Sequence, residues 1–344
     1  MRSHGAAPAK VNLTLEVLGR RADGYHALRS LVVFTAIGDV LRMGASDNGL
    51  PRGNSAASAL GAALTEPRSA GADGAGAADQ PRCTVGGPFQ NALADTPARD
   101  NLVVKALIAW CAATGASPGA LPSFELIKNL PVAAGIGGGS SDAAAALRLC
   151  QAWATDNTGC APMDAADLHA LALRLGADVP VCLASTPAMM EGIGEILTPA
   201  NLRSDIPAVL VNPGIAVPTG PVFKALAATQ LGLGAQPHSP HQTGEAPCFR
   251  NLEDLLAYTA ARPNDLEAPA LRLAPAMGAV RDALGTTGAR LVRMSGSGAT
   301  WFGLYDTNDQ ASAAGATIRA AHPAWWVQPT TIARTPHGQG HLQA

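Results

Sequence analysis

Hydrophobic and polar residues alternate near the start of the chain. Every second residue from Val11 to Val17 is apolar, and polar residues occupy the positions between them. This two-residue period predicts a half-buried β-strand. Asp23-Gly24 then predicts a turn, and the apolar run at 31–37 predicts a second strand.

The pattern changes to a helical period in the middle of the chain. Apolar residues gather on one face over 101–113, which predicts a helix, and residues 124–128 predict a short strand. A glycine-rich turn and a long alanine-rich helix follow this strand. Residues 168–175 predict a further helix, which we expect Gly176 to end in the left-handed conformation.

The C-terminal part of the chain contains both periods. It predicts helices over 252–261, 266–284 and 310–321, and strands over 290–294, 301–305 and 325–332. Because strands and helices do not alternate in a regular βαβ order, the pattern favours an α+β fold over a doubly wound sheet.

Two segments break the pattern. In residues 44–80, 18 of 37 positions are alanine or glycine and none is aromatic. Such a segment cannot bury enough apolar surface to offset the entropy of ordering, so we predict a mobile surface insertion. Residues 231–248 predict a loop, and its His238 and His241 have no third ligand nearby, which argues against a metal site.

Charge and composition exclude several classes of protein. The chain has 24 basic and 26 acidic residues, and no basic run is longer than Arg20-Arg21, so we expect no nucleic-acid surface. No apolar run approaches the ~18 residues of a membrane span. The first residues lack an apolar signal core, and the six cysteines form no CxxC pair. We therefore expect a cytoplasmic protein with buried thiols.

The strongest chemical signal is a glycine-rich run from Pro131 to Ser141, between a predicted strand and a predicted helix. Glycines let backbone N–H groups approach an anion, and Ser140 or Ser141 can cap the helix whose positive end faces that anion. Phosphate fits such a loop, although a flexible turn with a serine cap has the same composition. The run lacks the Lys-Ser/Thr of a Walker A loop, and Ser140 stands where a dinucleotide fingerprint needs a third glycine.

A phosphate loop without its own lysine needs positive charge from elsewhere. Lys10, one of four lysines, is the candidate at the start of the first predicted strand, where an ordinary solvated lysine fits equally well. Asp178 lies between a helix end and an apolar run predicted as a strand, and we expect Pro180 to keep its backbone extended. Asp178 is a candidate general base, or an aspartate in an Asx turn. Asp142 fits a helix N-terminal acid better than a second base.

Two signals are weaker. Residues 294–300 form a small-residue loop between two predicted strands, which either closes over the same phosphates or makes a tight hairpin. Tyr25-His26 offers an aromatic face and a hydrogen-bond donor. This pair is either a stacking platform for a base or ordinary surface packing.

Taken together, these motifs resemble the GHMP kinase superfamily. The glycine loop is shared across that superfamily, whereas the segments at 21–26 and 175–181 resemble one branch of it. That branch phosphorylates 4-diphosphocytidyl-2-C-methyl-D-erythritol in the non-mevalonate route to isoprenoids. The matching segments run in order across nearly the whole chain: 8–13, 21–26, 131–141, 175–181, 191–199, 212–214, 218–219, 223–224, 264–267 and 295–299.

The resemblance implies a two-domain α+β GHMP kinase fold. Residues 1–185 would form an N-terminal ribosomal-protein-S5-domain-2-like domain, and residues 186–344 a C-terminal ferredoxin-like domain. ATP and the small-molecule substrate would bind in the cleft between them, with Mg²⁺ accompanying ATP. The implied reaction is phosphorylation of the 2-hydroxyl of the substrate. The sequence identifies no metal ligand and no oligomeric state.

The resemblance also implies the roles of individual residues. The catalytic pair of the family corresponds to Lys10 and Asp178, with Asn12 near the reacting hydroxyl. The cytidine side corresponds to Tyr25, His26, Thr219 and Phe223. The ATP loop corresponds to Pro131, Val132, Ala133, Ala134, Gly135, Ile136, Gly137, Gly138, Gly139, Ser140 and Ser141. Its residues 132–134 depart from the more glycine-rich or Ser/Met-containing run of the family, which affects only the fine shape of the loop.

Three other functions are consistent with parts of the sequence. One is a GHMP kinase acting on another small alcohol, such as mevalonate or homoserine. Another is a non-catalytic RNA-binding module, which the absence of a basic stripe disfavours. The third, a nucleotide-dependent reductase, is disfavoured by the imperfect dinucleotide fingerprint.

Overall fold

A long central strand organises the sheet of this protein. The computed structural model describes residues 3–21, 25–44, 81–156, 161–230 and 247–334. Within these residues, an 11-stranded sheet is built around β3 (His26–Met43). Antiparallel partners lie along both edges of β3. This is clearest at positions 28–29 and 40–43, where each residue of β3 pairs with one strand on either side. One edge pairs with β1 (Ser3–Asn12) and β2 (Glu16–Arg20), and the other with β6 (Ala188–Gly192), β13 (Trp326–Ile332) and β5 (Phe124–Ile127).

The C-terminal part of the chain extends the same sheet through β13. Strand β13 pairs with β9 (Ile206–Asn212) along its whole length but meets β3 at one pair, Ile332 with Thr35. The order continues with β12 (Trp301–Leu304) and β11 (Leu291–Met294). Smaller strands complete the sheets: β4 (Cys83–Gly86) beside β5, β7 (Ile196–Pro199) beside β6, and the separate pair β8 (Asn201–Leu202) and β10 (Cys248–Phe249).

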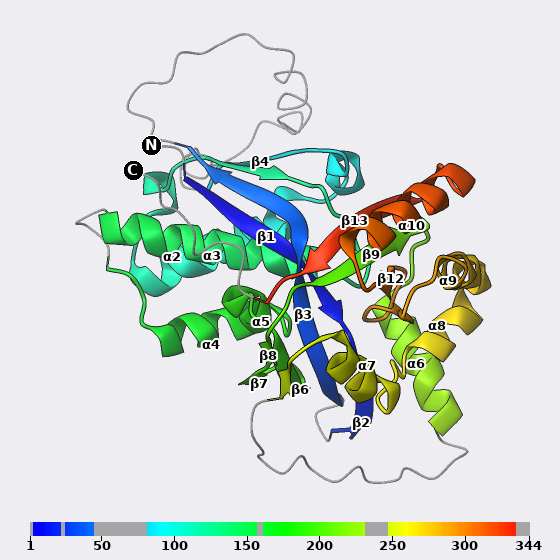
Figure 1. The fold of residues 1–344 in the computed structure, drawn as a ribbon. Helices are drawn as coiled ribbons and strands as arrows, with labels where there is room; N and C mark the ends of the chain where they lie inside the picture. The colour runs from blue at the N-terminus through cyan, green and yellow to red at the C-terminus, as the bar shows by residue number, and fades with distance from the viewer. Residues whose placement is uncertain (1–2, 22–24, 45–80, 157–160, 231–246, 335–344) are drawn as a thin grey trace.

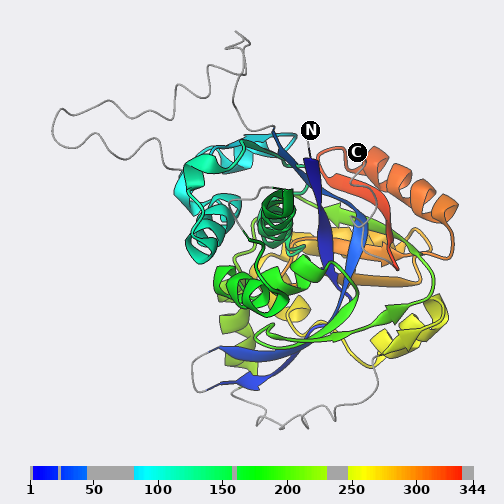
Figure 2. The same cartoon turned by 90° about the vertical axis from the view of Figure 1, so that its left-hand side faces the viewer.

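The helices separate into two groups on opposite sides of β1 and β3 (Figures 1 and 2). The N-terminal group consists of α2 (Leu102–Thr114), α3 (Gly138–Asp156), α4 (Ala165–Leu175) and α5 (Val179–Ala184). The C-terminal group contains α6 (Thr219–Gln230), α8 (Glu267–Leu273), α9 (Gly278–Gly285) and α10 (Asn308–Ala321), while α7 (Leu252–Ala260) lies near the lower end of β3. No helix in the described part of the chain is both long and apolar enough to span a membrane.

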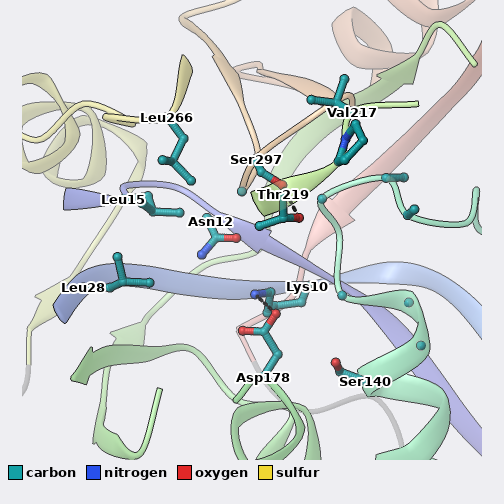
Figure 3. Close-up of a pocket in the computed structure, with 18 of the residues that line it drawn as sticks. Lys10, Asn12, Leu15, Leu28, Ser140, Asp178, Val217, Thr219, Leu266 and Ser297 are labelled. Carbon is teal, nitrogen blue, oxygen red and sulfur yellow. Dashed lines mark hydrogen bonds and ion pairs between the residues drawn. The ribbon is translucent and has the colours of Figure 1, made fainter. Parts of the chain in front are cut away.

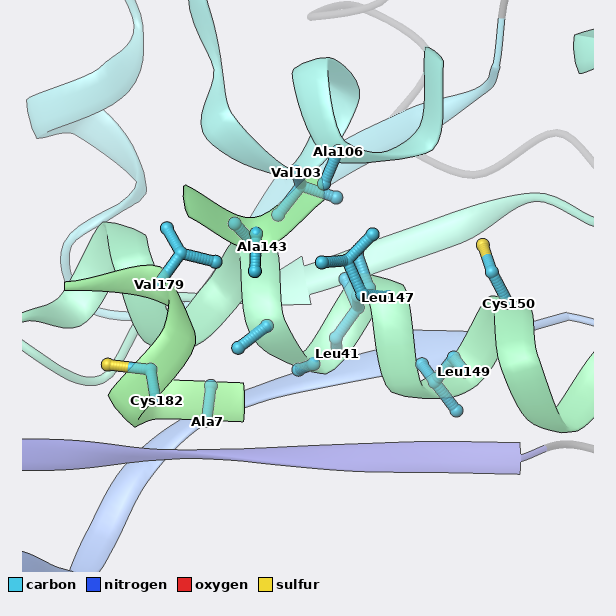
Figure 4. Packing of buried hydrophobic residues seen from close by; sticks show 14 of the residues in the cluster. Ala7, Leu41, Val103, Ala106, Ala143, Leu147, Leu149, Cys150, Val179 and Cys182 are labelled. Carbon is cyan, nitrogen blue, oxygen red and sulfur yellow. The ribbon is translucent and has the colours of Figure 1, made fainter. Parts of the chain in front are cut away.

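Small side chains let α3 lie close to the sheet. Ala143–Ala146 are fully buried, and they share an apolar cluster with Val103 and Ala106 of α2 and Ala7 of β1 (Figure 4). Alanine has the lowest intrinsic cost in a helix, and its short side chain permits close packing. The alanine-rich run therefore forms both the predicted helix and part of the core.

The first predicted strand is wrong in its bounds and in its burial. β1 ends at Asn12 and β2 begins at Glu16, and Lys10 lies near the end of β1 rather than at its start. The polar residues Asn12 and Thr14 are buried like their apolar neighbours. Both are hydrogen-bonded, Asn12 to Ser30 Oγ and Thr14 to the Leu31 N–H, so their burial leaves these polar groups satisfied.

Four details around the helices also differ from expectation. Residues 266–284 form two helices, because the chain breaks the helical pattern at Pro275. Gly176 is extended rather than left-handed, with φ 164°. Residues 179–184 form helix α5 instead of a strand, and Asp178 has helical rather than extended backbone angles. Pro180 is the second residue of this helix, where the first turn needs no backbone N–H donor. Helix α3 begins at Gly138, before either serine.

Other sequence predictions are confirmed. The described structure has an α+β architecture with the predicted helices and strands at 101–113, 124–128, 168–175, 252–261, 290–294, 301–305, 310–321 and 325–332, within a few residues at each end. Cys111, Cys150 and Cys182 are buried, whereas Cys248 is exposed. The predictions for residues 23–24, 45–80 and 231–246, including His238 and His241, lie outside the described residues.

Candidate active site

A cavity of about 380 Å³ opens between the two groups of helices (Figure 3). Its walls come from the end of β1, the glycine loop before α3, the start of α5 and the loops around α6 and 294–300. Segments far apart in the sequence thus meet here. The predicted residues that line it are Lys10, Asn12, Ala133, Ala134, Gly135, Gly137, Gly138, Gly139, Ser140, Asp178, Thr219 and Phe223.

Lys10 and Asp178 form an ion pair inside this cavity. Lys10 Nζ lies 2.7 Å from Asp178 Oδ2, and the two side chains point toward one another in Figure 3. The lysine side chain is only 4% exposed, whereas the aspartate is 34% exposed. The aspartate therefore remains accessible to a bound molecule while the ammonium is held close to it.

The glycine loop packs directly on Lys10. Lys10 N–H donates to the Ile136 carbonyl at 2.9 Å, and a Cβ at Gly137 would lie 3.0 Å from Lys10 Cβ. Gly137 also has φ +63°, a left-handed conformation that L side chains rarely adopt. Glycine is thus required here for close approach as well as for backbone conformation.

A second loop closes against the first. Ser295 Oγ donates to the Gly135 carbonyl at 2.9 Å, and a Cβ at Gly135 would lie 2.5 Å from the Ser295 carbonyl oxygen. Asn264 Nδ2 donates to the carbonyls of Met294 and Gly296. The loop at 294–300 connects the antiparallel strands β11 and β12, which confirms the hairpin interpretation. Its Gly296 and Ser297 also line the cavity, whereas closure over phosphates stays a prediction.

The cavity is lined by both polar and apolar side chains. Thr219 and Ser297 lie with their hydroxyl oxygens 2.9 Å apart across one wall (Figure 3), near the Asn12 side chain. Apolar side chains cover the neighbouring walls: Leu15, Leu28, Met190, Val217 and Leu266. The wall is therefore able to contact both a polar and an apolar part of a ligand.

Among the predicted aromatic residues, Phe223 lines the cavity and His26 does not. His26 stacks on Phe223 with ring centroids 4.9 Å apart, and burial together with the nearby Arg20 charge lowers the pKa of His26. Within the described residues, no group is hydrogen-bonded to His26 Nδ1 although that atom is buried. Tyr25 is 63% exposed and does not line the cavity, so its role in binding remains a prediction.

The glycine loop has a second cavity on its other side, of about 220 Å³. Pro131 and Val132 line only this second cavity, whereas Ala133, Gly138 and Gly139 line both. Lys128 lies beneath it in a buried contact with Asp39 and Asp142. Asp142 lies in the first turns of α3, as predicted for a helix N-terminal acid, and it also forms an ion pair with Lys128.

Two residues of the predicted loop have structural contacts instead. Ile136 is part of an apolar cluster and is 1% exposed. Ser141 is fully buried, and its hydroxyl donates to the Pro8 carbonyl at 2.7 Å. Neither side chain lines a cavity, so any contribution to ligand binding would come from backbone atoms.

Sequence reasoning missed several residues of the site. Ser297 lies in the small-residue loop at 294–300, but no individual role follows from its sequence. The apolar residues that line the cavity have no local sequence signature. The contacts of Asn264 and Lys128 depend on segments far away in the sequence. The scarcity of lysine in a chain with 24 basic residues was the one available signal for Lys128.

Arg148 of α3 connects the two elements that carry the ion pair. Its Nη1 donates to the carbonyls of Cys182 and Leu183 at the end of α5, and to Ser185 Oγ. Its Nη2 donates to the Ala6 carbonyl of β1 at 2.6 Å. Burial lowers the pKa of Arg148, but these acceptors still match a charged guanidinium.

Arg148→Met is therefore expected to lower kcat by about 10-fold or more, because small displacements of reacting groups are costly. The affinity for a ligand bound on the glycine loop should stay within about twofold, since Arg148 donates no hydrogen bond to that loop in the described part of the chain. Arg148→Lys should recover part of the loss, and Arg174→Met on the exposed face of α4 is the matched control. Steady-state kinetics, with kcat calculated per folded molecule, test this prediction. If kcat per folded molecule were the same in Arg148→Met and the wild type, Arg148 would not position the ion pair.

Two domain matches define the class of protein. The sequence matches the GHMP kinases N terminal domain over residues 101–186 and the GHMP kinases C terminal domain over residues 245–324. The structure of L. major mevalonate kinase in complex with R-mevalonate superimposes with a TM-score of 0.61 over 98% of this chain and 97% of that one, at 14% identity, which supports the fold alone. The fold and the two domain matches are those of a GHMP kinase.

Relatives that match over nearly the full length identify one family of GHMP kinases. The 4-diphosphocytidyl-2-C-methyl-D-erythritol kinase of Methylobacterium radiotolerans is 45% identical, covering 95% of this chain and 97% of the relative. The enzyme of the same name from Parvibaculum lavamentivorans is also 45% identical, over 94% and 96%. A crystal structure of 4-(cytidine 5'-diphospho)-2C-methyl-D-erythritol kinase has a TM-score of 0.65 at 32% identity, covering 97% and 100%. The chain belongs to the 4-diphosphocytidyl-2-C-methyl-D-erythritol kinase family.

Proposed function

We propose that this protein transfers the γ-phosphoryl group of ATP to the 2-hydroxyl of 4-diphosphocytidyl-2-C-methyl-D-erythritol. The observation that carries the proposal is the Lys10–Asp178 pair, with 2.7 Å between Nζ and Oδ2, beside the glycine loop. Phosphoryl transfer depends mainly on positioning and on electrostatic stabilisation. This cavity supplies both, through the backbone of the loop and the buried ammonium.

The proposed roles follow from the position of each group. Asp178 is accessible and accepts the proton of the attacking hydroxyl, as a general base does. Lys10 is held beside Asp178 and balances the negative charge that develops on the transferred group. The Asn12 side chain lies beside them and orients the hydroxyl (Figure 3).

The two cavities suggest how the two nucleotide-like ligands divide the site. The phosphates of ATP would lie along residues 133–140, at the N-terminus of α3, where backbone N–H groups and the helix dipole favour anions. The ATP base would then occupy the second cavity. The cytidine of the other substrate would contact His26, Phe223 and Thr219, on the opposite side of the loop, with Tyr25 at the rim.

Mg²⁺ would enter with ATP. Among the described residues, no three acid, histidine or cysteine side chains are grouped to hold a metal ion. This arrangement fits a cation held mainly by phosphate oxygens and water, as Mg²⁺ commonly is. When bound, the ion supplies charge neutralisation of the phosphates.

Further proposals concern organisation and setting. We place the domain boundary at 185/186, with domains at 1–185 and 186–344, although β6 pairs with β3 of the first domain and β7 continues the sheet beside β6. We also propose a cytoplasmic protein that binds neither nucleic acid nor membranes. Its net charge of −2 is consistent with small-molecule partners.

A coupled ADP-release assay tests the proposed reaction. ADP formation with 4-diphosphocytidyl-2-C-methyl-D-erythritol should exceed that with mevalonate or homoserine by at least about 10³-fold in kcat/KM, because a site built to hydrogen-bond a substrate rejects analogues lacking those groups. Higher turnover with either smaller alcohol would instead support the alternative GHMP kinase function.

A further inference from the structure

Three buried charged side chains connect both flanks of the glycine loop. Lys128, which precedes the loop, donates to Asp39 Oδ2 of β3 and to Asp142 Oδ2 of α3, the latter at 2.8 Å. Asp39 Oδ1 also accepts the N–H groups of Asn129 and Leu130 at 2.6 and 2.8 Å. The cluster of Asp39, Lys128 and Asp142 therefore joins β3, the segment before the loop and the helix after it.

The cluster lies directly beneath the proposed phosphate site. A Cβ placed on Gly138 would lie 3.4 Å from Lys128 Nζ and 3.6 Å from Asp39 Oδ2. Gly138 is the first residue of α3 and lines both cavities. Anionic phosphates bound along the loop would therefore be close to the charges of the cluster.

The cluster contains two carboxyl groups and one ammonium. Both carboxylate oxygens of Asp39 accept hydrogen bonds. Asp142 differs, because no group in the described residues donates to its Oδ1, and that atom is buried. Two buried carboxylates close to one another resist joint ionisation, so Asp142 is the group that a proton would occupy.

The titration of Asp142 agrees with this geometry. Burial raises the pKa of Asp142, Lys128 lowers it and Asp39 raises it, which together bring it to about 7. Lys128 itself stays charged: burial lowers its pKa, but the two carboxylates more than offset this effect.

We propose that Lys128 is a positioning residue that fixes both flanks of the glycine loop, and that Asp142 takes up a proton when nucleotide phosphates bind above it. The inference rests on the proposed function, because it requires the loop to bind a nucleotide. The incoming negative charge disfavours the Asp142 carboxylate, and protonation removes one negative charge from the cluster. The neutral acid also gains an O–H donor.

Other groups near Asp142 do not compete for this proton. Cys83 of β4 faces it, but burial and the Asp142 charge raise the pKa of the thiol to about 12, so it stays neutral. Asp100 lies at the outer side of the second cavity, where it pairs with Lys105 at 3.5 Å. Of the charged groups facing Asp142, Asp39 and Lys128 are held in the hydrogen bonds described above.

Calorimetric titration with MgADP at pH 7.5, in buffers of different ionisation enthalpy, measures the protons taken up on binding. The wild-type protein should take up roughly half a proton more than Asp142→Asn, which resembles the protonated acid in shape and charge. Asp309→Asn removes an exposed acid from the first turn of α10 and should behave as wild type. Equal proton counts for the wild type and Asp142→Asn would overturn the proposal, as would much weaker MgADP binding by a folded Asp142→Asn variant.

The pH dependence of wild-type binding provides a second measurement that needs no variant. The MgADP Kd should rise by up to about 10-fold between pH 6.5 and 8.5, because the tighter-binding form carries the proton. A Kd that stays constant over this range would overturn the proposal. Failure of the wild type to bind MgADP at all would instead refute nucleotide binding and hence the proposed function.

The positioning role of Lys128 is tested in the Asp142→Asn background. Adding Lys128→Met there leaves Asp39 as the one charged member, so the net charge of the cluster equals that of the ionised wild type. We expect at least about 10-fold weaker MgADP binding by the double variant than by the wild type at pH 8.5, where the two clusters carry the same net charge, with both proteins folded by circular dichroism. Equal binding by these two proteins at pH 8.5 would show that Lys128 does not position the loop.

Discussion

Asp178→Asn is expected to lower kcat by about 10²- to 10⁴-fold, the range that general base catalysis contributes. The amide cannot accept the proton of the attacking hydroxyl, although it can still accept a hydrogen bond from Lys10. Binding of MgADP should change by less than about threefold, because the carboxylate does not contact the loop. The coupled ADP-release assay gives kcat, and calorimetry gives the nucleotide Kd.

Asp167→Asn is the matched control for this variant, since Asp167 is an exposed acid in the first turn of the neighbouring α4. It should retain wild-type turnover. A near wild-type kcat in Asp178→Asn would remove Asp178 from the mechanism. Loss of nucleotide binding together with kcat would show that the aspartate shapes the site instead.

Gly135→Ala is expected to have the second large effect, on folding as well as on activity. The added Cβ would lie 2.5 Å from the Ser295 carbonyl oxygen and 2.7 Å from that of Gly298. The two loops would have to separate, and Gly135 also has φ +75°, which costs an L residue about 1–2 kcal/mol. We expect a lower Tm and at least about a 100-fold loss of kcat/KM, because loop geometry determines where the phosphates bind.

Gly115→Ala separates the two contributions to this effect. Gly115 has φ +74°, nearly the same as Gly135, but a Cβ there meets nothing within 4 Å. Its destabilisation should therefore be limited to the backbone cost, with activity unchanged. Thermal unfolding and kcat/KM measured on both variants make the comparison; equal Tm losses and full activity in Gly135→Ala would show that the loops separate without consequence.

The elements near the site were predictable where their signal was local. The glycine loop, the alanine-rich helix and most C-terminal elements follow from period and composition alone. Asp178 shows the limit of this reasoning. Its neighbours Val179–Ala184 form one short apolar run that fits a strand or a helix, and the choice depends on Arg148 and β1, which are distant in the sequence.

The same limit explains the missing parts of the site. Asn12 and Thr14 occupy polar positions of an alternating pattern, which predicts exposure, yet partners from β3 bury them. The contact between Gly135 and the 295–298 backbone joins residues about 160 positions apart, as the Ser295–Gly135 hydrogen bond does. The motif resemblance identified these segments and their order along the chain, but it did not predict which of them contact one another.

The length of β3 has a consequence for dividing this protein into pieces. Because β3 lies in the N-terminal part yet pairs with both β6 and β13, cutting the chain at 185/186 would not release two self-contained modules. Each fragment would expose an unpaired strand edge that the other one covers, and exposed edges promote association. The halves would thus behave as complementary fragments that reassemble, and not as independent domains that can be exchanged between proteins.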